Sequence, residues 1–213
     1  MYDLILFDLD GTLTNPEVGI TKSVQYALNA YGIEENSSEM LRRFIGPPLV
    51  DGFMEFYGMT RENASRAVEK YRERFSKIGI FENELIEGTE QMLKRLKQEG
   101  KRIALATSKP SPFAKQIIEH FGIDSYFDIV SCSELDGTRN DKAEVIAEAL
   151  RLAGDYKNPV MVGDRMHDVI GAKKNKIPCI GVSFGFAAEG ELSENGAVDI
   201  AASMSELTEM LLK

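Results

Sequence analysis

The chain opens with "MYDLILFDLDGTLT", residues 1–14, and this stretch decides how the rest of the sequence is interpreted. Residues 4–7 have the composition of a buried strand, yet the run ends in two aspartates, Asp8 and Asp10, followed at once by Gly11. Two carboxylates this close repel each other and lose solvation when buried, so stability alone would rarely place them at the end of a core strand. We therefore expect a positive group between them.

Short apolar runs like the first recur along the chain, at residues 4–7, 102–106, 127–130, 160–163 and 179–182. Amphipathic helical segments separate them, among them about 89–99 and 111–121, each followed by a glycine that ends a helix well. Strands that alternate with helices in this way predict an α/β domain with a parallel sheet.

Residues 15–81 break this alternation because they contain helical periods and no convincing strand. Three apolar stripes at helical spacing carry this interpretation: Val24, Leu28 and Tyr31; Leu49, Phe53 and Phe56; Ala64, Val68, Tyr71 and Phe75. The segment begins at Asn15-Pro16 and ends near Gly79. We therefore predict a small helical bundle inserted between the first strand and the rest of the α/β core.

The composition is that of a soluble globular protein. Of 213 residues, 43% are apolar and 28% charged, and no apolar run approaches the roughly 18 to 20 residues of a membrane span. No basic segment precedes the first apolar run, as a secretory signal would require. Cys132 and Cys179 lie in apolar segments with the character of strands, so we expect buried thiols and a reducing cytoplasm.

The formal net charge of −9 argues against a nucleic-acid surface, which needs a basic field. This charge is unevenly distributed. Residues 15–81 contain nine Lys or Arg and nine Asp or Glu, so the whole excess lies in the remainder. If the substrate is an anion, the core must reverse its own sign locally, and a bound cation is the simplest way to do so.

Two acidic clusters suggest where that cation would bind. Asp8 and Asp10 project to the same side of an extended strand, and Asp164 and Asp168 are one helical turn apart after the run at 160–163. Oxygen ligands with few His or Cys favour Mg²⁺. An Asp-rich turn at 8–12 remains an alternative, while a calcium loop would have its glycine at the sixth position rather than the fourth.

Other strand and helix ends provide hydroxyls and cations. Thr107, Ser108 and Lys109 follow the apolar run at 102–106, and hydroxyls with main-chain N–H groups before a helix form an anion site. Lys142 opens another helix, where a lysine opposes the helix dipole and gains nothing locally. Taken singly, a helix cap at Ser108 and a solvated lysine at Lys142 are equally good interpretations.

In their order along the chain, these motifs resemble the haloacid dehalogenase superfamily of phosphohydrolases: "DLDGT" at 8–12, the strand end at Thr107, Lys142, and "GDRMHD" at 163–168. The resemblance implies an α/β fold with a Rossmann-like doubly wound sheet (1–14 and 82–213) and an inserted helical cap (15–81). The resemblance implies that Asp8 is the nucleophile, Asp10 the general acid/base, and Thr107 and Lys142 phosphate binders. Ser108, next to Thr107, is a further candidate for binding phosphate. The implied Mg²⁺ ligands are Asp8, Asp164 and the Asp10 carbonyl, while Asp168 would orient Lys142 or the waters on the metal.

The segment 15–81 resembles the cap of the phosphoglycolate phosphatase and β-phosphoglucomutase branch. In this reading "RRFIGPPL" would be a substrate-facing loop, in which Arg42 or Arg43 reaches the leaving group, and we select Arg43 because it lies nearer the Gly-Pro-Pro turn. A plain turn between two helices is an equally good interpretation. Ala143 departs from the proline frequent after the branch's lysine, which leaves Arg139 as a second candidate for the role of Lys142.

The expected function is therefore a Mg²⁺-dependent phosphatase of small phosphate monoesters, phosphoglycolate-type or nucleotidase-like, that uses an aspartyl-phosphate. A phosphosugar mutase on the same fold is the alternative. A dehalogenase would need neither Asp10 nor a metal, and intact candidates at every catalytic position disfavour a non-catalytic binding module. The expected partner is a small phosphorylated metabolite, with no nucleic-acid polymer and no membrane, and the expected assembly is a monomer or weak dimer.

Overall fold

The computed structural model describes residues 1–213, which divide into two compact units. One consists of Met1–Asn15 and Leu85–Lys213, and the other of Pro16–Glu84. The helical unit thus ends three residues later than the segment 15–81 delimited from the sequence. The two segments that cross between the units, β2 (Thr14–Asn15) and β3 (Glu84–Leu85), pair as a two-stranded sheet.

A six-stranded sheet forms the centre of the first unit, in the order β5-β4-β1-β6-β7-β8, and every neighbouring pair is parallel. Its strands are β1 (Leu4–Phe7), β4 (Arg102–Pro110), β5 (Ile129–Ser133), β6 (Pro159–Gly163), β7 (Cys179–Val182) and β8 (Asp199–Ala201). From β1 the chain adds strands first on one side and then on the other. The predicted doubly wound parallel sheet is confirmed.

All five predicted strands occur, although the bounds of some differ from the prediction and one further strand joins the sheet. β4 continues to Pro110, with an irregularity in its pairing to β5 between Thr107 and Pro110, and β5 starts two residues later than predicted. β8 was not predicted, because only three residues pair and they include the exposed Asp199. Strands paired on one side carry a weak apolar signal.

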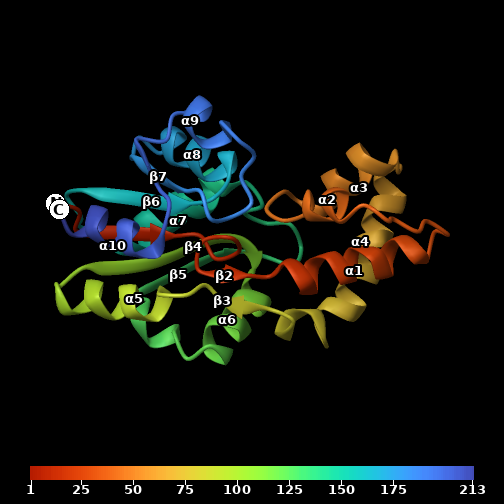
Figure 1. The fold of residues 1–213 in the computed structure, drawn as a ribbon, viewed down its shortest axis with the longest axis horizontal. Coiled ribbons are helices and arrows are strands. Elements are labelled where there is room, and N and C mark those ends of the chain that lie inside the picture. The colour runs from red at the N-terminus through yellow and green to blue at the C-terminus, as the bar shows by residue number, and fades with distance from the viewer. The chain divides into compact units, whose positions relative to one another are not determined.

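Helices cover both faces of this sheet (Figure 1). Leu4 and Leu6 belong to the core that also contains apolar residues of α7 (Lys142–Ala153), α8 (Met166–Lys174) and α9 (Glu191–Asn195). Ile5 and Phe7 alternate with them and must face the opposite side. On that side lie α5 (Thr89–Gln98) and α6 (Ser111–His120), and α10 (Met204–Leu212) packs against α5.

The second unit contains four helices and one short 3₁₀ turn, η1 (Gly79–Phe81). The helices are α1 (Glu17–Asn29), α2 (Ser38–Arg42), α3 (Leu49–Tyr57) and α4 (Arg61–Phe75). The predicted stripe on α4 is buried throughout, whereas Tyr31 lies beyond the end of α1. The five-residue α2 was not predicted, since it buries no side chain and so has no periodic signal. No helix of either unit has the length and apolarity needed to cross a membrane.

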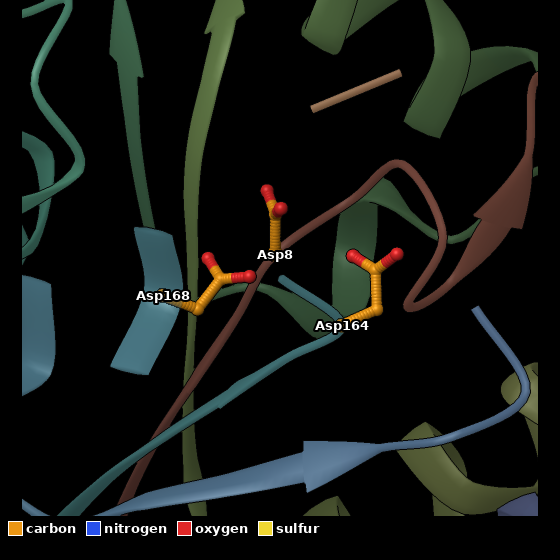
Figure 2. A group of neighbouring side chains, drawn as sticks. All are labelled: Asp8, Asp164 and Asp168. Atoms are coloured by element: carbon orange, nitrogen blue, oxygen red, sulfur yellow. The ribbon is translucent and has the colours of Figure 1, made fainter. Parts of the chain in front are cut away.

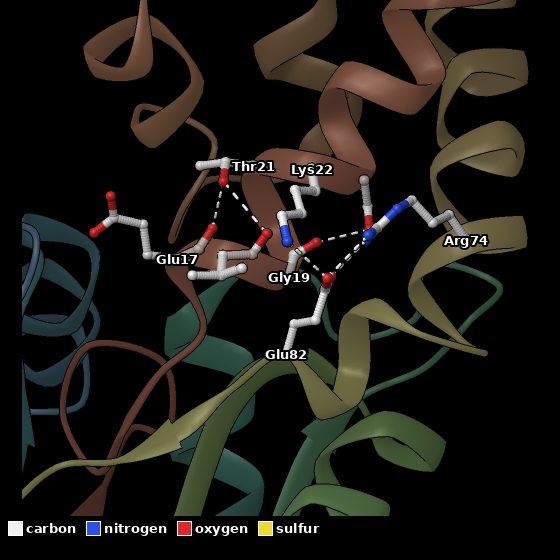
Figure 3. Close-up of polar contacts among 8 residues, drawn as sticks. Glu17, Gly19, Thr21, Lys22, Arg74 and Glu82 are labelled. Atoms are coloured by element: carbon white, nitrogen blue, oxygen red, sulfur yellow. Dashed lines mark hydrogen bonds and ion pairs between the residues drawn. The ribbon is translucent and has the colours of Figure 1, made fainter.

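Besides the buried faces of α1 and α4, two clusters of side chains contribute to the packing of the helical unit. Phe44 packs against Phe53, Phe56 and Tyr57, with ring centroids 4.9 to 6.1 Å apart. A polar cluster joins α1 and α4 to the segment after η1, where Glu82 accepts hydrogen bonds from Arg74 and Lys22 (Figure 3).

Candidate active site

Three carboxylates meet where the central strands end. Asp8 directly follows β1, Asp164 directly follows β6, and Asp168 lies in the first turn of α8. All three are buried, and one oxygen of each lies within 4.8 Å of one oxygen of the others (Figure 2). Because β1 and β6 are parallel neighbours, their carboxyl ends bring residues far apart in sequence to one edge of the sheet.

Two glycines allow the chain to pass this close to Asp164. Gly11 has a φ of +82°, and a Cβ at this position would lie 2.1 Å from the Asp164 carboxylate. A Cβ at Gly185, in the loop after β7, would lie 2.4 Å from the Asp164 Cβ. Any side chain at either position would displace the carboxylate, so both backbone approaches are part of how the site is built.

Lys142 is the cation of this cluster. The Asp141 side chain caps α7 by accepting from the Ala143 N–H at 2.7 Å, which places Lys142 at the first position of the helix. Its Nζ lies 2.7 Å from Asp8 Oδ1 and 2.9 Å from Asp168 Oδ1, and it donates to the Ala106 carbonyl at 3.2 Å. The unfavourable interaction of Lys142 with the dipole of its own helix is thus offset by two carboxylates from other elements.

Burial and neighbouring charges shift the pKa values of Lys142, Asp164 and Asp168. Burial alone would lower the pKa of Lys142, but Asp168 and Asp8 outweigh it and raise that pKa. Burial, together with Asp168 and Asp8, raises the pKa of Asp164 well above its usual value. Burial also raises the pKa of Asp168 to about 6, against the opposing effect of Lys142. The site therefore holds more negative charge than its lysine offsets.

The donor set fits a divalent cation. Asp164 Oδ2 accepts from the Phe186 N–H at 2.8 Å, while Asp164 Oδ1 is buried without a hydrogen-bond partner. Asp168 is already engaged by Lys142 and by the Arg165 N–H, at 3.1 Å. Four buried or nearly buried carboxylates and two lysines leave a formal excess of two negative charges. A cation coordinated by oxygen would satisfy both the charge and the unpaired atom.

Asp10 has a cation of its own, which the sequence did not suggest. Its Oδ2 lies 2.5 Å from Lys109 Nζ, and its Oδ1 is buried without a hydrogen-bond partner. Burial raises the pKa of Asp10, although Lys109 opposes this effect. Positive charge therefore does accompany the two aspartates of the first strand, since Asp8 pairs with Lys142 and Asp10 with Lys109.

The carboxyl end of β4, which contains Thr107 and Ser108, lies in the same unit. Thr107 is buried, and its Oγ1 accepts from the Lys109 N–H at 3.2 Å. The Ser108 carbonyl accepts from Ser133 Oγ at 2.6 Å. These bonds hold the turn that carries both hydroxyls predicted to bind phosphate.

Three arginines were named as candidates, and each has an acidic partner in its own unit. Arg42 pairs with Glu17 at 2.7 Å. Arg139 pairs with Glu134 and donates to the Cys132 carbonyl, so Lys142 rather than Arg139 is the cation next to Asp8. Arg43, in the helical unit, lies with its guanidinium 4.0 Å from the centroid of the Phe56 ring and 3.5 Å from the Glu55 carboxylate.

Sequence reasoning also missed the loop that supports Asp164. Glu191 accepts from the Arg165 side chain at 2.9 Å, from the Met166 N–H at 2.8 Å and from the Ala188 N–H at 3.0 Å. It thereby ties the turn after β6 to the loop whose Phe186 N–H reaches Asp164. The segment "SFGFAAEGE", residues 183–191, has no helical or strand periodicity. Its glycines are the one feature that could have indicated a close backbone approach.

The fold and this site define an α/β enzyme with a carboxylate cluster at the carboxyl ends of parallel strands. Residues 5–182 match the family model of the haloacid dehalogenase-like hydrolases. The chain belongs to this family. This confirms the resemblance found in its motifs and the expectation of a phosphoric monoester hydrolase on this fold.

Similar proteins cover nearly the whole chain. A protein of Pseudomonas aeruginosa named 5'-nucleotidase is 45% identical over 99% of this chain and 96% of its own length. The tyrosine-protein kinase PtkA of Mycobacterium tuberculosis is 36% identical over 98% of this chain and 72% of its own length. The crystal structure of a predicted phosphatase from Clostridium acetobutylicum superposes with a TM-score of 0.95 at 45% identity, covering 100% of this chain and 99% of that one.

Proposed function

We propose that the chain is a Mg²⁺-dependent phosphatase that hydrolyses small phosphate monoesters through an aspartyl-phosphate formed on Asp8. The observation that carries this proposal is the buried ion pair between Asp8 Oδ1 and Lys142 Nζ, at 2.7 Å, within the carboxylate cluster. A carboxylate beside a fixed cation can approach an anionic phosphate, whereas an isolated carboxylate would be repelled by it.

Asp8 acts as the nucleophile. One carboxylate oxygen forms a bond to phosphorus while the bond between phosphorus and the ester oxygen breaks. Lys142 offsets the negative charge that gathers between Asp8 and the phosphoryl oxygens. Water then cleaves the acyl phosphate, which releases inorganic phosphate and restores the Asp8 carboxylate.

Asp10 moves the protons. Because burial raises its pKa, a protonated fraction persists closer to neutral pH than for an exposed aspartate, as a general acid requires. Its unpartnered Oδ1 gives the proton to the leaving oxygen and later accepts one from the attacking water. The hydroxyls of Thr107 and Ser108, at the end of β4, would bind the phosphoryl oxygens.

Asp8, Asp164 and the main-chain carbonyl of Asp10 would hold the Mg²⁺. When bound, the ion supplies the positive charge that draws the phosphoryl group into the acidic cluster and stabilises the charge developing in transfer. Asp168 has a different role, because its ion pair with Lys142 holds that lysine beside Asp8.

Nucleoside 5'-monophosphates are the first substrates to test, since the 45% identical relative carries the name 5'-nucleotidase. The experiment measures phosphate release with Mg²⁺ from these nucleotides, phosphoglycolate and sugar phosphates, with Asp8→Asn as the blank. Acid-quenched enzyme should retain a phosphoryl label that hydroxylamine removes, as expected for an acyl phosphate. Full activity after exhaustive chelation, or label retained by Asp8→Asn, would contradict the mechanism.

Two further measurements distinguish water from other possible acceptors of the phosphoryl group. Isomerisation of a sugar phosphate without phosphate release would indicate the mutase. Transfer from ATP to a tyrosine peptide would indicate the activity named for the 36% identical relative. We expect water to be the acceptor in both measurements.

A further inference from the structure

The proposed mechanism leaves one buried charge without a function. Lys109 follows Thr107 and Ser108 at the end of β4, and only 6% of its side chain is exposed. Its ammonium group lies 2.5 Å from Oδ2 of Asp10, whose side chain is 14% exposed. Both residues belong to the α/β unit, and they reach each other from two different strand ends.

Stability alone does not explain this pair. Removing two charges from water costs several kcal/mol per ion, and an apolar pair of similar volume is often as stable or more stable. Of the two carboxylate oxygens, the pair occupies Oδ2 and leaves Oδ1 buried without a partner. This arrangement suits a carboxyl group that must be fixed in orientation while one oxygen stays available to a reactant.

The position of Lys109 is itself set by the site. Its N–H donates to Thr107 Oγ1 at 3.2 Å, and the preceding carbonyl, of Ser108, accepts from Ser133 Oγ at 2.6 Å. The pairing of β4 with β5 is irregular across this segment, so Lys109 leaves the regular strand path. The turn that presents the Thr107 hydroxyl therefore also presents the Lys109 ammonium group.

Asp8 and Asp10 each pair with a different lysine of the site. Lys142 pairs with Asp8 and Asp168, whereas Lys109 pairs with Asp10. Lys142 is already shared by two carboxylates, so the cation that orients Asp10 is supplied by Lys109 alone. Separate cations allow Asp8 and Asp10 to perform different tasks two residues apart.

We propose that Lys109 is a positioning residue that holds Asp10 by Oδ2, so that Oδ1 faces the leaving oxygen of the substrate. This inference rests on the proposed function, because it assigns Lys109 to the proton-transfer step of that mechanism. Lys109 does not contact the phosphoryl group in this proposal and acts only through Asp10.

The test compares leaving groups that do and do not need a proton. The 4-nitrophenolate ion leaves unaided, whereas the alkoxide of a nucleotide does not, so only the nucleotide depends on Asp10 for the first step. We measure the pre-steady-state burst of nitrophenolate and the single-turnover release of nucleoside. The variants are Lys109→Met, Lys109→Arg, Asp10→Asn, the double variant of Lys109→Met with Asp10→Asn, and Lys115→Met, an exposed lysine of α6, as the control.

In Lys109→Met we expect the nitrophenolate burst rate to stay within about threefold of the parent, while nucleoside release falls by roughly 10²-fold, the lower range for general acid catalysis. Lys109→Arg should recover part of this loss, and Lys115→Met should match the parent. The double variant should be no slower than Asp10→Asn, because residues that act as one unit are not additive.

Three results would overturn the proposal. If burst and nucleoside release fell equally with a raised KM, Lys109 would be a substrate-binding cation. If the double variant were slower than Asp10→Asn by the full Lys109→Met factor, Lys109 would act independently of Asp10. If Asp10→Asn lost nucleoside release and a folded Lys109→Met did not, this inference alone would fail. No turnover by the parent on any ester would instead remove the proposed function, and this inference with it.

Discussion

At the scale of single residues, Asp8 carries the most direct prediction. Asp8→Asn should fold as the parent does and lose turnover by at least about 10³-fold, because an amide is a poor nucleophile toward phosphorus and removal of a nucleophile commonly costs more than this. The measurements are steady-state phosphate release and a thermal melt of the same sample. A folded variant that kept more than a tenth of the activity, a loss of only ~1.4 kcal/mol, would falsify the assignment.

From the burial of Asp164 we predict how the stability of the metal-free protein responds to pH and to Mg²⁺. Burial raises its pKa in the folded protein well above the ordinary value for an aspartate, so the fold favours the protonated form. The free energy of unfolding therefore decreases as the pH rises from about 4 through the folded pKa, and the ionised carboxylate destabilises the metal-free protein at neutral pH. Asp164→Asn, which cannot ionise, should melt higher than the parent without metal.

Mg²⁺ should then raise the melting temperature of the parent by roughly 5–10 °C at a hundred times its Kd, and leave that of Asp164→Asn unchanged. This readout requires no substrate. The control is Asp155→Asn, at an exposed position, which should respond to Mg²⁺ as the parent does. An equal Mg²⁺ response in Asp164→Asn would remove Asp164 from the set of metal ligands.

The sequence could predict which residue types gather in the site, but not all of their pairings. Asp8, Asp164 and Lys142 stand at strand and helix ends in patterns with a physical reason, and the structure brings them together. Lys109 was noted as a cation beside two hydroxyls, yet its pairing with Asp10 depends on the irregular end of β4, which strand periodicity does not reveal. Contacts made by main-chain groups, such as the Phe186 N–H, leave still less trace in the residue types.

At the scale of elements, predictability followed burial. The central strands β1, β4 and β6 are continuous apolar runs because neighbours cover both their edges and both their faces. The edge strand β8 and the two-residue β2 and β3 escaped prediction because only a few of their residues are buried. The helix α4 was recognisable because its buried stripe, from Ala64 to Phe75, keeps the helical period over about three turns.

The polar cluster around Glu82 in the helical unit should make the stability of the protein depend on pH (Figure 3). The hydrogen bond from Arg74 lowers the pKa of Glu82, although partial burial opposes this shift. A lowered carboxyl pKa contributes stability above the unfolded value of about 4.5, which is lost as the pH falls through the folded pKa. Arg74→Met should therefore reduce the free energy of unfolding by about 2 kcal/mol at pH 7, and by clearly less near pH 3.

Urea unfolding of the parent and the variant at both pH values measures this difference. Lys77→Met, at an exposed position just after α4, is the matched control and should cost little at either pH. A loss of the same size at pH 7 and pH 3 would show that Arg74 acts through packing of its stem and not through the Glu82 charge.

At the scale of the whole molecule, the two units differ in charge. Residues 15–81 are neutral, and extension of the helical unit to Glu84 adds two glutamates, so most of the net charge of −9 still belongs to the α/β unit. An acidic unit that must accept an anion needs its cations placed at the site, as Lys109 and Lys142 are. The helical unit is under no such constraint, and this difference favours separate tasks, with the chemistry in one unit and substrate selection in the other.

Substitution of Arg43 tests whether the helical unit selects the substrate. Half of its side chain is exposed, and its guanidinium is already oriented by the Phe56 ring. A preorganised cation loses little freedom on binding, so it can select the polar part of a leaving group. Arg43→Ala should change the ranking of natural monoesters, by about tenfold between the most and least affected, while hydrolysis of 4-nitrophenyl phosphate stays nearly constant. Arg66→Ala, an exposed arginine on α4, should leave the ranking intact. A uniform loss across all substrates, accompanied by a lower melting temperature, would mean that Arg43 serves the packing of α2 on α3, and substrate selection would then have to come from other side chains of the helical unit.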